Sequence, residues 1–245
     1  KTFEMINILL TIFCSTSIAI FLKFNDTKNG NPLILLMGNY FVASIISIIT
    51  LLTESENSNQ ILYPIILFGL FLGSLFLISF FSFAKAVNLS GTPLSTISSR
   101  LSVIVPVLLS ILIFNESPSL FQTFGLLFAI LAIILFYFAI SHKSNDKVNS
   151  KKFSVLLLVL VGIGVSDFGM KIFNELNQEE NKNLFLFSIF FSAFIYTLII
   201  VCLKKIKVDR RTFLLGGVLG VPNLYSSFFL IGALSSYSAV VVYPT

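Results

Sequence analysis

Charged residues are scarce in this chain of 245 residues. Lys and Arg together number 16 and Asp and Glu number 11, so charged side chains make up 11% of the sequence, whereas soluble proteins average about 25%. A soluble fold of this size needs a polar surface, which so few charges cannot supply. The scarcity excludes a disordered chain, a nucleic-acid-binding arm and an ordinary cytosolic enzyme.

Cysteine and histidine are rarer still. The two cysteines, Cys14 and Cys202, lie inside apolar runs, and His142 is the only histidine. A disulfide framework is therefore not expected, and neither is a metal site built from Cys and His ligands. We expect no cofactor and no enzyme activity, because a membrane-embedded enzyme needs clustered His, Asp, Ser or Cys side chains. The sequence also contains no ATP-binding loop.

The chain is instead rich in hydrophobic residues, many of which lie in long uninterrupted stretches. Hydrophobic residues make up 56% of it, and its mean hydropathy is +0.96. A helix needs about 20 apolar residues to cross the hydrocarbon core of a bilayer. We therefore predict an all-α, multi-pass protein of the cytoplasmic membrane, with its helices joined by short polar loops. Eight stretches are long enough: Met5–Phe21, Leu33–Leu52, Leu62–Phe83, Leu94–Phe114, Leu120–Ile140, Phe153–Phe173, Leu184–Leu203 and Phe213–Leu234.

The chain is similar to itself when it is shifted by 147 residues. Gly69 and Gly73 then fall on Gly216 and Gly220. The G-x-x-x-G step that these glycines form allows two helices to approach closely. One reading is an internal repeat of the kind found in transporters. The alternative is that matched small residues reflect only generic helix packing.

The repeat divides the chain into a first unit of five helices, residues 1–140, and a second unit, residues 153–245. Because five is an odd number, the second unit enters the membrane from the opposite side, which makes the repeat inverted. The second unit stops within its fourth helix. We therefore expect ten helices in two five-helix units, of which about eight and a half are present in this chain.

Three charged side chains fall inside the predicted membrane helices, where a charge costs about 2.5–3.5 kcal/mol. Arg100 follows Ser99 in a serine-rich helix and offers five donors to a substrate carboxylate or phosphate. It can equally pair within the protein. Asp167 is a candidate proton acceptor or a partner for a substrate amine. Lys171, four residues later, is a second candidate for ion coupling, but the two charges can instead neutralise each other on one helix face.

Uncharged polar residues mark the last complete helix. The stretch GVPNLYSS places Pro222, Asn223 and Tyr225 near its centre, where proline frees a backbone carbonyl group. Asn223 and Tyr225 are candidates for substrate binding, together with Arg100, Asp167 and Ser99. Asn223 can alternatively form a hydrogen bond between helices.

These motifs resemble those of the drug/metabolite transporter superfamily, in its EamA-like family. The similarity is best in residues 81–136, FSFAKAVNLSGTPLSTISSRLSVIVP through GLLFAILAIILF, where an alanine at the end of one helix precedes a serine-rich helix, then Glu116 and a helix with Gly125. The stretches GVSDFGMKIF and GVPNLYSSFFLIGALSSYSAVVVYPT resemble the second-half counterparts. The resemblance implies two inverted five-helix repeats, alternating access and a central cavity on or near which Arg100, Asp167 and Asn223 lie.

The sequence gives two conflicting predictions for the side of the membrane on which the N-terminus lies. The basic loops after Ile140 and Leu203 lie on one side of the membrane together with Lys28, and the other side carries only Lys1 and Lys182. The positive-inside rule places the basic loops in the cytoplasm and the N-terminus outside. The resemblance implies a cytoplasmic N-terminus.

The favoured function is a secondary carrier, an exporter or permease, of small organic metabolites such as amino acids. Its partners are the lipid bilayer, a small-molecule substrate and protons as a candidate coupling ion, with no nucleic acid, in a monomer or homodimer. The alternative is a structural or partner-binding membrane subunit that transports nothing. Such a subunit explains the glycine steps, but it does not explain an arginine and an acid buried in separate repeats.

Overall fold

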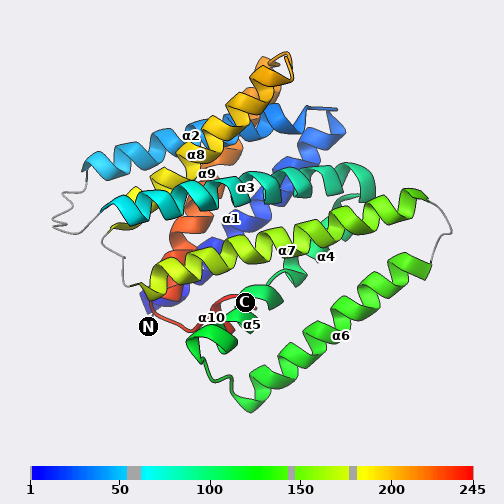
Figure 1. Ribbon diagram of the computed structural model, residues 1–245, viewed down its shortest axis with the longest axis vertical. Coiled ribbons are helices and arrows are strands. Elements are labelled where there is room, and N and C mark those ends of the chain that lie inside the picture. The colour runs from blue at the N-terminus through cyan, green and yellow to red at the C-terminus, as the bar shows by residue number, and fades with distance from the viewer. Residues whose placement is uncertain (1, 54–61, 143–146, 177–180, 245) are drawn as a thin grey trace.

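The computed structural model describes residues 2–53, 62–142, 147–176 and 181–244, and no strand occurs in these ranges. Helices joined by short connections make up most of the described chain (Figure 1). The helices are α1 (Thr2–Thr27), α2 (Pro32–Thr53), α3 (Leu62–Ser90), α4 (Thr92–Leu101), α5 (Ile104–Phe114), α6 (Leu120–His142), α7 (Lys147–Glu175), α8 (Lys182–Leu203), α9 (Arg210–Leu234) and α10 (Ala239–Val242).

The prediction of an all-α, multi-pass membrane protein is confirmed. The described residues contain 8 segments that are long and apolar enough to cross a membrane, with α4 and α5 together forming one of them. Several helices extend beyond the predicted apolar stretches: α1 continues to Thr27 and α3 to Ser90. A helix ends where its backbone hydrogen bonds end, and polar residues near the membrane surface can continue it.

The fourth predicted helix is not continuous, which corrects the expectation for Leu94–Phe114. It divides into α4 and α5 at Ser102 and Val103. Pro106 has no N–H to donate to the Ser102 carbonyl group, which accepts instead from the amide of Val105 at 3.0 Å. The Ser102 hydroxyl also donates to the Ser99 carbonyl group at 2.6 Å. The break therefore lies one turn from Arg100.

Two of the close helix crossings in the bundle depend on glycine pairs. At the α3–α8 crossing, a Cβ atom on Gly69 would lie 2.5 Å from the Ser188 Cβ. At the α2–α9 crossing, a Cβ atom on Gly220 would lie 2.5 Å from the Asn39 carbonyl oxygen. Real Cβ atoms essentially never approach other atoms within 3.0 Å, so only glycine permits these two contacts.

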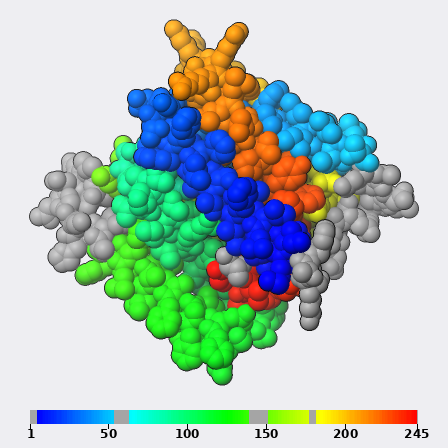
Figure 2. All heavy atoms as spheres, turned by 180° about the vertical axis from the view of Figure 1, so that it is seen from behind, coloured from blue at the N-terminus to red at the C-terminus, as the bar shows by residue number. Residues whose placement is uncertain are grey.

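The main contacts between helices follow a reciprocal pattern across the two predicted units. The third helix of each predicted unit, α3 or α9, packs against the second helix of the other unit, α8 or α2. The first helices follow the same rule, because α1 packs on α9 and α7 packs on α3. Figure 2 shows α1 (blue) lying across one face of the molecule, between α9 (orange) and the teal segments of α3 and α4.

The loop between α8 and α9 and the first turn of α9 carry exposed basic residues, Lys204, Lys205, Lys207, Arg210 and Arg211. Asp209 caps the start of α9 by accepting hydrogen bonds from the Thr212 amide at 2.9 Å and from its hydroxyl at 2.7 Å. These bonds lower the pKa of the Asp209 carboxyl group. Lys1 and Lys143, which the charge argument also used, lie outside the described residues.

The glycine contacts predict a sharp contrast between two substitutions. Gly73→Leu places a side chain against the backbone of Ile189 on α8, and overpacking of this kind costs about 1–3 kcal/mol. Gly125→Leu on α6 is the matched control, because a Cβ atom there meets nothing within 4 Å. In a Cys202→Ser background, which removes the exposed cysteine, a thiol-reactive fluorophore that reports exposure of buried Cys14 should give a lower melting temperature for the first variant only. Equal melting temperatures would contradict the packing described.

Candidate functional site

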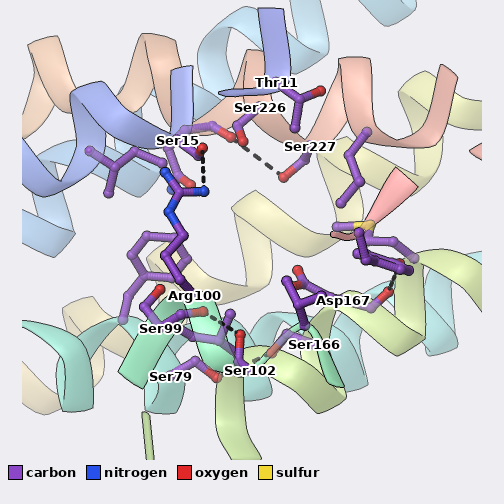
Figure 3. A pocket seen from close by; sticks show the side chains of 18 of the residues that line it. Thr11, Ser15, Ser79, Ser99, Arg100, Ser102, Ser166, Asp167, Ser226 and Ser227 are labelled. Atoms are coloured by element: carbon purple, nitrogen blue, oxygen red, sulfur yellow. Dashed lines mark hydrogen bonds between the residues drawn. The ribbon is translucent and has the colours of Figure 1, made fainter. Parts of the chain in front are cut away.

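A cavity of about 170 Å³ lies between α1, α3, α4, α7, α9 and α10. Its walls combine apolar side chains with many hydroxyl groups and two charged groups, Arg100 and Asp167 (Figure 3). The serines that line it are Ser15, Ser79, Ser99, Ser102, Ser166, Ser226 and Ser227. The lining residues come from helices of both predicted units.

Arg100 projects from the last turn of α4 toward α1, and its side chain is exposed, which corrects the expectation of a buried arginine. Its guanidinium group donates to the Ser15 hydroxyl at 3.4 Å and to the Thr16 hydroxyl at 3.2 Å. A cation at a helix C-terminus is stabilised by the partial negative charge of the helix end. Both acceptors are neutral, so the positive charge of Arg100 is not cancelled by the groups that hold it.

Asp167 belongs to α7 and lies across the cavity from the position that Arg100 occupies (Figure 3). In the described part of the chain, no ion pair joins the two side chains. The backbone carbonyl group of Asp167 accepts a hydrogen bond from the Tyr243 hydroxyl at 2.7 Å. The cavity therefore presents a positive group and a negative group from separate helices, with space between them.

One pair of serines connects α3 and α7 at the cavity. The Ser79 hydroxyl on α3 lies 3.1 Å from the Ser166 hydroxyl on α7. Ser166 also donates to the Gly162 carbonyl group at 2.8 Å. Gly162 and Gly164 let α7 approach closely, since a Cβ atom on Gly164 would lie 2.7 Å from the Ser102 carbonyl oxygen at the break between α4 and α5.

Asn223 faces both the cavity and a neighbouring helix. It lines the cavity, and its amide group donates to the Asn39 side-chain oxygen on α2 at 3.1 Å. Both side chains are buried, Asn223 at 1% exposed and Asn39 at 0%. The amide nitrogen of Asn39 has no hydrogen-bond partner among the described residues, so the pair depends on this single bond.

Tyr225 is not among the described residues that line the cavity, whereas Ser99 is. Positions two apart on a helix point in nearly opposite directions, so Tyr225 cannot share the direction of Asn223. The Tyr225 ring stacks on Phe229 with the ring centroids 5.9 Å apart. The structure thus brings together Arg100, Asp167, Ser99 and Asn223 but leaves Tyr225 in an aromatic cluster.

Lys171 does not pair with Asp167, although the two residues are four apart on α7. Its ammonium group instead contacts Glu116 at 2.7 Å and Glu175 at 2.5 Å, and its side chain is 3% exposed. The long lysine side chain extends toward the end of α7, where both carboxylates lie. Lys171 is not among the residues that line the cavity, and Asp167 keeps its place there without it.

The sequence did not single out Tyr243 or the hydroxyl groups of α1 as site residues. Tyr243 lines the cavity from the segment after α10, and Thr11 and Ser15 line it from α1. Thr11 and Ser15 are four residues apart and therefore share a helix face. That spacing of hydroxyl groups in an otherwise apolar helix is the signal that could have identified them.

Helices that cross a membrane and surround a polar, charged cavity are typical of membrane transporters. The model of the EamA-like transporter family matches residues 2–138. The chain therefore belongs to the EamA-like transporter family, a group of membrane transporters whose substrate is a small molecule.

One similar protein comes from Haemophilus influenzae and is described as an uncharacterized protein. It is 29% identical to this chain over 248 residues, which cover 96% of this chain and 81% of the relative. The similarity thus extends past the residues that the family model matches and includes the helices that carry Asp167 and Asn223.

The asparagine pair predicts non-additive effects on stability. Asn223→Leu leaves the Asn39 amide buried without a partner, and a buried unsatisfied group costs about 1–3 kcal/mol. Adding Asn39→Leu removes the unpaired group, so the double variant should be more stable than the sum of the single variants predicts. Thermal unfolding of the four proteins in detergent measures the coupling. Strict additivity would show that the bond contributes nothing.

Proposed function

We propose that this protein is a secondary carrier of small zwitterionic metabolites, such as amino acids and related compounds, and that it works by alternating access. The observation that carries the proposal is the pair of opposite charges in one cavity. Arg100 and Asp167 come from different helices and both line the space between them. A substrate with a carboxylate at one end and an ammonium group at the other matches this arrangement.

Arg100 is suited to the carboxylate end. A guanidinium group presents planar, paired donors that fit a carboxylate in a bidentate manner. Its present partners, the hydroxyl groups of Ser15 and Thr16, accept at 3.4 and 3.2 Å, which are weak bonds to neutral groups. A substrate carboxylate offers a charged acceptor in their place, so binding exchanges weak neutral contacts for stronger charge-assisted ones.

Asp167 is suited to the ammonium end. Its side chain has no ion-pair partner in the described part of the chain, because Lys171 is held by Glu116 and Glu175. The carboxylate is therefore available to a cation that enters the cavity. The same carboxylate is our candidate proton acceptor, and we assign the coupling role to Asp167 rather than to Lys171.

The size of the cavity supports a small substrate. Pockets for drug-sized ligands occupy about 300–1,000 Å³, and this cavity has about 170 Å³. Its serine hydroxyl groups can donate or accept and so can adapt to the polar groups of a small metabolite. Its apolar lining, which includes Phe76, Phe80 and Met170, leaves room for a short side chain.

Alternating access needs two bundles that move against each other. The reciprocal packing of α3 on α8 and of α9 on α2 places glycines at the contacts between the predicted units, so no large side chains interlock there. Inverted repeats commonly rock about a central site in this way. Arg100 from the first unit and Asp167 from the second contribute to the same cavity, so motion of one unit changes the distance between the two charges.

The roles of the two charges predict different losses for different substrates. Arg100→Ala should weaken uptake of amino acids and monocarboxylates by about 10–100-fold in KM, the loss expected for about 1.5–3 kcal/mol of charged hydrogen bonding. Uptake of monoamines should change far less. Proteoliposomes tested with this panel measure the effect, and Arg211→Ala at an exposed position in the first turn of α9 is the matched control. Unchanged KM for every compound would contradict the role of Arg100, and absence of any transport by the native protein would favour a structural subunit.

The proposed role of Asp167 predicts that a substitution there can abolish proton coupling while substrate exchange continues. Asp167→Asn removes the charge but keeps the size of the side chain, so uptake driven by a pH gradient should be lost in sealed proteoliposomes. Exchange of substrate between the two sides needs no net proton movement and should persist at a reduced rate. Asp209→Asn is the control, because asparagine caps a helix as well as aspartate does. Full pH-driven uptake by Asp167→Asn would exclude the coupling role.

A further inference from the structure

An ionic cluster around the buried ammonium group of Lys171 lies beside the cavity but does not belong to it. Lys171 on α7 contacts two carboxylates, Glu116 at 2.7 Å and Glu175 at 2.5 Å. Glu175 is on the same helix as Lys171, one turn later. Glu116 comes from the segment between α5 and α6, so its contact with Lys171 is the one that ties separate parts of the chain together.

Local backbone geometry directs Glu116 toward α7. Helix α5 ends at Asn115, which adopts the left-handed conformation with φ 54° and ψ 33°. Asparagine is among the few residues other than glycine that tolerate this conformation, and it reverses the direction of the chain immediately before Glu116. The Glu116 side chain is only 13% exposed, so its charge is committed to contacts inside the protein.

Glu116 also holds the start of α10. Its two carboxylate oxygens accept hydrogen bonds from the backbone amides of Ala239 at 3.1 Å and Val240 at 3.3 Å. These are the first two amides of α10, which have no partner within the helix, and Ser238 before them makes no side-chain cap. One carboxylate therefore joins α7, through Lys171, to α10.

The segment that Glu116 holds forms one wall of the cavity. Val242 and Tyr243, at the end of α10, both line the cavity. The Tyr243 hydroxyl reaches the Asp167 backbone carbonyl group at 2.7 Å. The wall is thus attached to α7 at two points, by Glu116 to Lys171 and by Tyr243 to Asp167.

From these contacts we infer that Glu116 is a positioning residue of the carrier. By joining Lys171 to the first amides of α10, it fixes the wall that carries Val242 and Tyr243 against Asp167 and closes the cavity on that side. Loss of the Glu116 charge releases this wall while Lys171 keeps its partner Glu175. The inference deepens the proposed function, because the cavity is the substrate site in that proposal, but the wall itself can be tested without any substrate.

The test measures access of water-soluble reagent to the cavity. In a background with Cys14→Ala and Cys202→Ser, the variant Ser226→Cys places a single thiol on the cavity. Its rate of reaction with a cationic methanethiosulfonate is measured in lipid nanodiscs. Adding Glu116→Gln should raise the rate roughly tenfold, the change expected on losing about 1.4 kcal/mol of charged hydrogen bonding.

Glu175→Gln is the matched control, since it removes the other carboxylate that contacts Lys171 without touching α10. Its labelling rate should stay near that of the parent, and Glu116→Asp should restore part of the slow labelling. Equal rates for Glu116→Gln and Glu175→Gln would overturn the inference, because the cluster would then serve stability alone. If the variants show the expected labelling rates but the native protein transports no substrate, the result counts against the proposed function and not against the role of Glu116.

A second variant keeps the test decisive if Glu116→Gln does not yield folded protein. Tyr243→Phe removes one hydroxyl group, and with it the other attachment of the wall, while leaving the ionic cluster intact. It should raise the labelling rate in the same direction by a smaller factor. An unchanged rate in Tyr243→Phe would contradict the claim that this wall closes the cavity.

Discussion

The cost of a charge in hydrocarbon is the constraint on which the structure depends. Each charge costs about 2.5–3.5 kcal/mol near the middle of a membrane helix, so each needs a partner or a polar space. Arg100 contacts two hydroxyl groups of α1, and Lys171 lies between two carboxylates. Asp167 lies on the cavity without an ion pair in the described ranges. The bundle therefore encloses a polar cavity in a chain that is otherwise mostly apolar.

Close helix packing supplies the frame around that cavity. The hydrophobic effect does not drive helices together inside a bilayer, because the lipid tails are as apolar as the side chains. Helix association therefore depends on small residues that let the backbones approach closely. Gly69 and Gly73 on α3, and Gly216 and Gly220 on α9, provide this at two reciprocal crossings. The crossings bring helices of both predicted units to one centre. The glycine steps and the charged residues thus have complementary roles. The glycines allow the helices to pack closely around the cavity, and the charged residues make its interior able to bind polar solutes.

The sequence predicted the class of fold because hydrophobic length alone identifies membrane helices. It also drew attention to Arg100 and Asp167, since a charge inside an apolar run is conspicuous. It did not predict the partner of Lys171, because the i, i+4 rule takes account of one helix only, whereas Glu116 arrives from a loop distant in sequence. The break at Ser102 and the position of Tyr243 at the cavity could not be predicted from the sequence either, because both depend on how separate segments pack.

The central claim is that the space between Arg100 and Asp167 is a polar binding site that holds both ends of a zwitterion. An experimental structure in a lipid nanodisc, determined with an amino acid that the protein transports, tests it most directly. The account predicts ligand density with its carboxylate within hydrogen-bond distance of the Arg100 guanidinium group, about 2.7–3.2 Å, and its ammonium group beside the Asp167 carboxylate. A cavity filled by a lipid acyl chain, with the ligand bound elsewhere, would contradict it.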